Sequence, residues 1–437
     1  MPRSRISIVA ALAIVVAATG WAAAKRVSLI DEARILPSEH PAIDYWSAKP
    51  TDAVADLQAK LDSGEITLEH DRRFGYLPAV LKALDVPISS QVLVFSKTSF
   101  QAVRIVPRAP RALYHNPEVA VGWVRSGDVV EIASLDPKLG VVFYTLHQAE
   151  STRPWLQAHT TQCIGCHLGP ATLGVPGLLV RSVHTDRSGT VHRARAFITD
   201  HRSPLEERWG GWYVSGKHGE QTHMGNVTYE RDLWPTSLLG SESDNVQSLY
   251  PYINPYNYLS PGSDIASLML LEHQTRMTNL IVRLGYETRI ALSDSPAATS
   301  LDELPEKARN GIEAASEELL RYMLFADEAL LDEPVRGSDD FKADFEAAGP
   351  RDNKGRSLRT LDLDRRLLRY PCSYMVYSKA FNALPAPAKR LIYQRLWQVL
   401  TGRDESPEFS RLTTEDRQAI LEILLATKSD LPAYWRG

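Results

Sequence analysis

Hydrophobic residues in the first 150 positions fall into short runs that predict an antiparallel sheet. The runs are rich in β-branched and aromatic residues: VLVFS (92–96), EVAVGWV (118–124), VVEIASL (129–135) and GVVFYTL (140–146). Turn residues separate the later runs, at 126–128 and 136–140. Two helical patterns precede them: AVADLQAKLDSG (53–64) and LPAVLKALDV (77–86). Residues 25–150 are therefore expected to form an α+β domain with an antiparallel meander.

The pattern changes twice after residue 150. Residues 177–200 alternate around Asp186-Arg187-Ser188-Gly189, which predicts a β-hairpin within a central segment, 151–240. From residue 241 the chain is expected to be mainly helical as far as residue 437, with helices over 263–285, 387–402 and 413–428. Residues 335–360 are polar and Gly-rich, which predicts a long surface loop or linker. The fold class is α+β.

The first 24 residues have the pattern of a secretory signal peptide. MPRSR carries two arginines, a short apolar run follows, and small residues at Ala22 and Ala24 precede Lys25. The run is slightly short of spanning length, so an uncleaved N-terminal anchor is the alternative and the only expected membrane attachment. The mature protein is expected to be periplasmic or otherwise exported.

Composition supports a folded protein without a nucleic-acid partner. The 437 residues are 44% hydrophobic and 23% charged, as in ordinary globular proteins. The formal charge is −4, and it becomes −6 without Arg3 and Arg5 because residues 1–24 contain no acid. A nucleic-acid partner would require a basic face, which this balance does not favour.

The segment TQCIGCHLGP (161–170) carries the strongest chemical signal. It holds two of the three cysteines in the chain, and His167 directly follows Cys166. Cys-x-x-Cys-His is the attachment pattern of c-type haem. Two thiols one helical turn apart reach the two vinyl groups on one porphyrin edge, and the adjacent histidine binds the iron as proximal ligand. Cys163, Cys166 and His167 are therefore predicted to hold one covalent haem c.

Three other interpretations of the same residues compete with haem. A thioredoxin-like dithiol would follow a strand in a βαβ pattern, and STRPWLQAHTTQ (151–162) shows no strand run. A zinc site would recruit the distant Cys372, which lacks a partner at ligand spacing. A disulfide between Cys163 and Cys166 would be strained. Cys372 itself is expected to be a buried thiol without a reactive role.

At these residues the chain resembles the bacterial exported c-type cytochromes with one haem, through CIGCH (163–167) behind a secretory signal. It also resembles a group of uncharacterised cytochrome c domain-containing proteins, in which the haem motif precedes a run like DHRSPLEERWGGWYVSGKHGEQTHMGN (200–226). The resemblance implies covalent haem, export and one-electron chemistry, for which a redox partner protein is expected. The predicted hairpin departs from the mostly helical haem pocket of small cytochromes c.

The sixth iron ligand decides between an electron carrier and a catalyst. Met224 is the leading candidate, because it lies in a Gly-bearing turn downstream of the motif and thioethers bind haem iron. His223 is adjacent and is one alternative. His273 is another, since Met269, His273 and Met277 share one face of a predicted helix.

Other side chains are weaker candidates for the haem surroundings. The aromatic group Trp209, Trp212 and Tyr213 is expected to pack on the porphyrin or in an ordinary core. Basic residues would neutralise buried propionates, and the candidates are Arg181, Arg193, Arg195 and Lys217.

Two functions follow. The first is one-electron transfer by an exported c-type cytochrome with both axial positions filled. The second is a periplasmic haem enzyme of peroxidase or small-molecule oxidase type with an open sixth iron position, favoured by the size of the chain.

Overall fold

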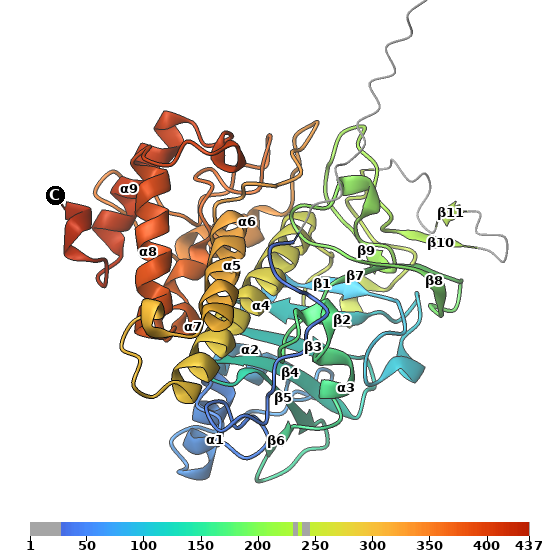
Figure 1. Cartoon of the computed structure of the whole chain (residues 1–437). Coiled ribbons are helices and arrows are strands. Elements are labelled where there is room, and N and C mark those ends of the chain that lie inside the picture. The colour runs from blue at the N-terminus through green and yellow to red at the C-terminus, as the bar shows by residue number, and fades with distance from the viewer. Residues whose placement is uncertain (1–27, 230–234, 238–244, 437) are drawn as a thin grey trace, which may run out of the picture.

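The fold is α+β, as predicted, with a large sheet built mainly from the N-terminal half and helices mainly from the C-terminal half (Figure 1). A computed structural model describes residues 28–229, 235–237 and 245–436, and only the backbone of 193–195 and 235–237. The predicted signal peptide, 1–24, lies outside the described residues.

Seven strands form one antiparallel sheet in the order β6-β5-β4-β3-β2-β1-β9. Their bounds are β1 Val92–Val94, β2 Arg111–His115, β3 Val119–Trp123, β4 Val129–Asp136, β5 Gly140–His147, β6 Leu156–His159 and β9 Trp212–Tyr213. Strands β2 to β6 pair in chain order, so the predicted meander is confirmed. The sheet takes β6 and β9 from the segment predicted separately as 151–240.

Strand β6 of this sheet has no hydrophobic run in the sequence. The prediction that no strand precedes the Cys-x-x-Cys-His motif is wrong, because β6 lies four residues before Cys163. This strand is at the edge of the sheet and turns only Leu156 into the core. Backbone pairing with β5 holds it, so it needs no apolar pattern of its own. It runs antiparallel to β5, which still excludes a βαβ unit there.

A separate hairpin follows the motif where it was predicted. It pairs β7 Arg181–Thr185 with β8 Val191–Ile198. A further two-stranded sheet pairs β10 Val227–Tyr229 with β11 Pro235–Ser237. Both lie beside the β9 edge of the large sheet in Figure 1.

Eight α-helices accompany the sheet among the described residues, besides the single turn α3 described below. They are α1 Ala53–Asp62, α2 Leu77–Ala83, α4 Ile265–Asp294, α5 Glu306–Met323, α6 Asp339–Ala347, α7 Lys379–Asn382, α8 Ala386–Leu400 and α9 Thr414–Thr427. Helices α1, α2, α8 and α9 match the predicted segments. Helix α6 corrects the prediction of a loop over 335–360: Ser338 accepts a hydrogen bond from the Phe341 amide as N-cap, and Phe341 and Phe345 are buried one turn apart.

Helix α4 is the central element of the helical part. It continues nine residues beyond the predicted end at Gly285, where the glycine lies inside the helix rather than after it. Nearly every side of its first half is buried, between the sheet and the layer formed by α5 and α8 (Figure 1). One hydrophobic core runs from Ile30 to Trp435 through both parts. In the part of the chain that the structure describes, no helix has the length and apolar character needed to cross a membrane.

Candidate functional site

The Cys-x-x-Cys-His motif forms a single helical turn, α3 (Ile164–His167). The amides of Cys166 and His167 both donate to the Cys163 carbonyl, each at 3.1 Å. Residues three and four positions apart lie on the same side of a helix. The turn therefore directs both sulfurs and the imidazole to one side, and all three cysteines of the chain are free thiols.

The imidazole of His167 is held by one of its two nitrogens. Its Nδ1 lies 2.9 Å from the carbonyl oxygen of Gly177, which in return donates its amide to the His167 carbonyl at 3.0 Å. A carbonyl partner requires that Nδ1 carries the proton. The lone pair is then on Nε2, which makes no hydrogen bond with any described residue. This is the tautomer and orientation that metal-binding histidines adopt.

The surroundings of His167 favour its neutral form by lowering its pKa. Burial lowers its pKa, Arg111 and Arg181 lower it further by repulsion, and the hydrogen bond to Gly177 opposes the shift. A neutral imidazole has a lone pair available at neutral pH, whereas a protonated one cannot bind a metal. The ring contacts the Phe143 ring, with 4.5 Å between centroids.

Helix α4 positions the segment that carries the Gly177 carbonyl. The buried Asn279 side chain receives the Leu178 amide at 2.9 Å and donates to the Leu178 carbonyl at 2.7 Å. A Cβ on residue 177 would lie 2.2 Å from Asn279 Oδ1, so only glycine allows this approach. The orientation of His167 thus depends on a residue more than one hundred positions later in the chain.

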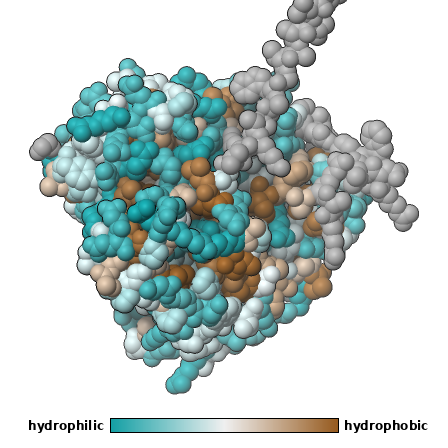
Figure 2. Space-filling view, viewed as in Figure 1, coloured by the Kyte–Doolittle hydropathy of each residue, from teal (hydrophilic) through white to brown (hydrophobic). Residues whose placement is uncertain are grey.

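One face of the sheet adjoins α3 and is lined by small residues. Ala120 pairs with Ala133, which pairs with Phe143, so these three side chains share the face that His167 contacts. The two alanines are only half-buried. Figure 2 shows hydrophobic side chains gathered in the lower middle of this view, in the area where Figure 1 draws β3 to β5 beside α3. The small, half-buried side chains leave space for a bound group on this face, next to the motif.

An ion pair that the sequence pattern does not reveal lies on the same face. Arg111 Nη2 is 2.6 Å from Glu131 Oε2, and both side chains are mostly buried. The guanidinium lies over Gly122, where a Cβ would meet Arg111 Nη2 at 2.3 Å. Burial and Glu131 together raise the pKa of Cys163. Arg111 was not a predicted site residue, because it comes from a strand with no local motif.

Met224 contacts strand β7, which follows the motif in the chain. Its sulfur is 3.5 Å from the Ser182 hydroxyl, and the neighbouring residue Arg181 is one of the groups that lower the pKa of His167. The Trp212 indole donates to the Arg181 carbonyl at 2.8 Å. Met224 is half-buried. The structure describes no contact between Met224 and His167.

The two histidine alternatives have other partners. His273 is completely buried, with Nδ1 2.8 Å from Nδ1 of His201 and Nε2 2.8 Å from the Ser373 hydroxyl, so both of its nitrogens are engaged. This arrangement counts against His273 as an iron ligand. His223 accepts the Gly225 amide at Nδ1 and lies against Trp209, while its buried Nε2 has no partner among the described residues.

The remaining predicted residues are dispersed. Arg181 is half-buried next to the motif, whereas Lys217 is exposed on a segment that pairs with Arg336. The side chains of Arg193 and Arg195 lie outside the described residues. Trp209 and Tyr213 are core residues, and Tyr213 donates to the Pro107 carbonyl at 2.8 Å.

Cys372 is distant from these contacts and matches its predicted role as a buried thiol. It is fully buried, and burial raises its pKa to about 12, which keeps it protonated. Among the described residues, no three or more histidine, cysteine or acidic side chains gather in the manner of metal ligands. A site that joins Cys372 to Cys163 and Cys166 is therefore not formed in this structure.

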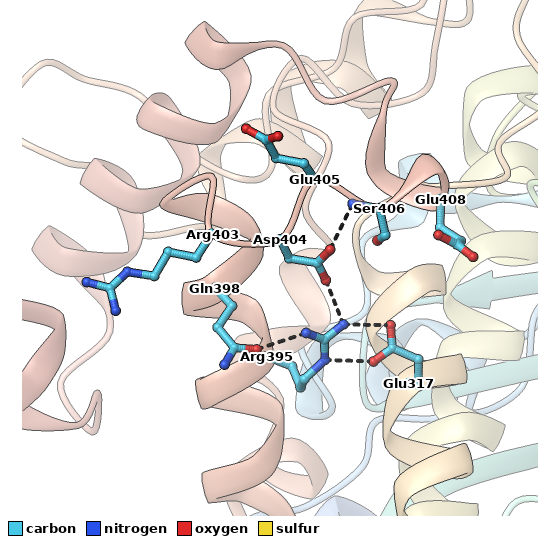
Figure 3. A pocket seen from close by; sticks show the side chains of 8 residues that line it. All are labelled: Glu317, Arg395, Gln398, Arg403, Asp404, Glu405, Ser406 and Glu408. Carbon is cyan, nitrogen blue, oxygen red and sulfur yellow. Dashed lines mark hydrogen bonds and ion pairs between the residues drawn. The ribbon is translucent and has the colours of Figure 1, made fainter.

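A pocket of about 560 Å³ on the helical side offers less chemistry (Figure 3). Its central Arg395 is paired with Glu317 and Asp404 and donates to Gln398, as the dashed lines in Figure 3 show. The charges at its centre thus satisfy one another.

Comparison of the chain with protein-family models, with curated proteins and with solved structures finds no match. The evidence for function is therefore the geometry of the motif.

Proposed function

We propose that the chain is an exported c-type cytochrome with one covalently bound haem, which transfers single electrons. The observation that carries the proposal is the arrangement of α3: two thiols and an imidazole on one side of one turn. The imidazole is held at Nδ1 by Gly177, and its Nε2 has no partner among the described residues. This donor set fits haem c, because the cofactor needs two thioether links and one neutral nitrogen from the same turn.

In this proposal each residue near the turn has a specific task. Cys163 and Cys166 anchor the haem, His167 provides the proximal nitrogen, and Met224 is the proposed sixth ligand. The haem supplies an iron centre that accepts and returns one electron. Gly177 fixes the imidazole, and a hydrogen bond to Nδ1 makes Nε2 a stronger donor.

The charged neighbours favour the same cofactor. Arg111 and Arg181 act on His167, and cations at this position are suited to the two propionates of haem. The Glu131 carboxylate that holds Arg111 would compete with a propionate for the guanidinium. We propose a periplasmic location, a redox partner protein and no nucleic-acid partner. Any membrane attachment would be through an uncleaved N-terminal segment.

Haem attachment is tested by paired cysteine variants. Expressed with a haem-attachment system, the wild-type protein should be recovered from the periplasm and keep its haem in acidified acetone. The double variant Cys163→Ala/Cys166→Ala should release it. Cys372→Ala is the matched control, because that thiol is buried away from the motif and its loss should leave the haem attached. Release of haem from the wild-type protein, or retention by the double variant, would refute the proposal.

The alternative, a haem enzyme with an open sixth position, is favoured by one observation. Met224, His223 and His273 each have other partners in this structure, and no described contact joins any of them to His167. Carbon monoxide distinguishes the two functions. If the reduced wild-type protein does not bind the gas and Met224→Ala does, the carrier is supported. Binding by the wild-type protein would support the enzyme.

A further inference from the structure

A second pocket lies apart from the motif, beside the connection between β2 and β3. It measures about 780 Å³, within the range of small-molecule sites. Its walls come from this connection, from α4, from α6 and the residues after it, and from the segment around Tyr374. These elements belong to both halves of the chain, so the pocket exists only in the complete fold.

The pocket contains the guanidinium of Arg359, which has no counter-ion among the described residues. The side chain of Arg359 lies between two aromatic rings, with Cζ 4.1 Å from the centroid of Phe345 and 4.8 Å from that of Tyr374. Its Nε donates to the Phe345 carbonyl at 2.7 Å. The two terminal nitrogens form no hydrogen bond or ion pair with any described residue. Burial lowers the pKa of Arg359, and no carboxylate opposes this shift.

The arginines of the other pocket show why this environment is unusual. Arg395 is similarly enclosed, but two carboxylates neutralise it (Figure 3). Arg403 lies over the Trp397 ring at 4.2 Å, but it is exposed, so water solvates its charge. Arg359 is half-buried and has no anionic partner among the described residues. A half-buried cation that faces a pocket and lacks a carboxylate partner favours binding of an anion there.

The uncharged polar groups of the pocket already have hydrogen-bond partners. His115 is buried with Nε2 2.8 Å from the Ser267 hydroxyl, and burial lowers its pKa to about 4, so it carries no charge at neutral pH. The Tyr374 hydroxyl donates to Gln274 Oε1 at 3.1 Å, and Gln274 in turn donates to the Asn116 carbonyl at 3.1 Å. These mutual hydrogen bonds leave Arg359 as the group that requires a partner.

The rest of the pocket limits the shape and charge of the ligand. Buried apolar side chains form its inner walls, among them Leu81, Val86, Leu270 and Phe341. Acidic residues also line it, and Asp85 and Asp344 among them are exposed. Apolar walls favour a hydrophobic body. Acidic side chains near the opening disfavour a ligand with several negative charges.

We propose that this pocket binds a small organic monocarboxylate, whose carboxylate pairs with the Arg359 guanidinium and whose hydrophobic body lies against the apolar walls. The guanidinium fork matches a carboxylate with two parallel hydrogen bonds. Phe345 and Tyr374 hold the fork in place, so little side-chain entropy is lost on binding. The site is independent of the haem proposal.

Benzoate is the probe, and titration calorimetry on the full-length mature protein is the measurement. Benzoate should bind with a dissociation constant below about 1 mM. Benzamide, which has nearly the same shape and no charge, should bind at least about tenfold more weakly. Inorganic phosphate should also bind more weakly, because it lacks a hydrophobic body. No benzoate binding up to about 10 mM, or equal binding of benzamide, would overturn the proposal.

Two variants assign the effect to Arg359. Arg359→Gln retains much of the packing and removes the charge, and it should raise the dissociation constant for benzoate at least about tenfold. Arg403→Gln is the matched control, since it also removes an arginine stacked on an aromatic ring, and benzoate binding should not change. Circular dichroism establishes that each variant is folded. Unchanged benzoate affinity in a folded Arg359→Gln protein would refute the proposal, and the wild-type comparison of benzoate with benzamide stands even if that variant fails to fold.

Discussion

Two hydrogen bonds join Asn279 of α4 to Leu178, and we call this contact the joint. It gives the most direct test of how the fold orients His167. Asn279→Ala removes both hydrogen bonds to Leu178, which measure 2.9 and 2.7 Å. Each contributes about 1 kcal/mol net, and Asn279 is only 2% exposed, so the polar groups left behind regain little water. We expect the free energy of unfolding to fall by about 3 kcal/mol.

Urea unfolding measures this change, and a loss below about 0.5 kcal/mol would show that the joint does not stabilise the fold. A second variant perturbs the same joint from the opposite side. Gly177→Ala places a Cβ 2.2 Å from Asn279 Oδ1, so it should separate the same two segments and cause a loss of similar size.

A readout at the haem distinguishes positioning from general stability. If the proposed cofactor is bound, a looser Gly177 carbonyl weakens the hydrogen bond to His167 and makes the imidazole a poorer donor, so the reduction potential should rise in Asn279→Ala. Gln91→Ala is the control. Gln91 is a buried amide that donates to Ser260 and Gly262 carbonyls at 2.6 and 2.7 Å. Its loss should cost stability without a change in potential, and an equal shift in both variants would refute the positioning role.

Two further predictions concern pH and the loop after the motif. Burial lowers the pKa of three buried histidines below the ordinary 6.5, to about 4 for His115 and about 3 for His223 and His273. As pH falls, the histidines become protonated in the unfolded chain before they do so in the folded protein, which favours unfolding. Each histidine should therefore lower the free energy of unfolding by about 2 kcal/mol at about pH 5 and have no effect above about pH 7.5. Urea midpoints that stay constant between these pH values would contradict this. Gly174→Ala should cost at least about 2 kcal/mol in thermal unfolding, because φ is +71° and the new Cβ would lie 2.1 Å from the Arg34 carbonyl oxygen. A loss within about 0.5 kcal/mol would show that the loop relaxes.

The parts of the fold that could be predicted from sequence are those with a local repeating pattern. Strands β1 and β3 to β5 coincide with hydrophobic runs, and the helices α1, α8 and α9 have buried side chains at helical spacing, so the pattern alone indicates them. Strand β6 was not predicted, because backbone hydrogen bonds to β5 hold it in place. Such bonds do not depend on which side chains the strand carries. The predicted end of α4 at Gly285 is wrong. This glycine lies inside the helix, because packing on both sides of α4 stabilises it beyond that residue.

The candidate site divides in the same way. Cys163, Cys166 and His167 are found from sequence because one helical turn brings them together. Gly177, Asn279 and Arg111 are not, because a later segment, a distant helix and a strand bring them to His167 through the tertiary fold. The charge and orientation of the imidazole depend on this second group.

The large separation in sequence between Asn279 and the motif also affects the order of events during synthesis. Asn279 leaves the ribosome about a hundred residues after Leu178. The motif therefore emerges well before Asn279, the residue that completes the joint and so orients His167. During that interval the two thiols are accessible in a chain that has not closed around them. A fragment that stops short of α4 would contain every residue of the Cys-x-x-Cys-His motif, yet its histidine would have no fixed orientation.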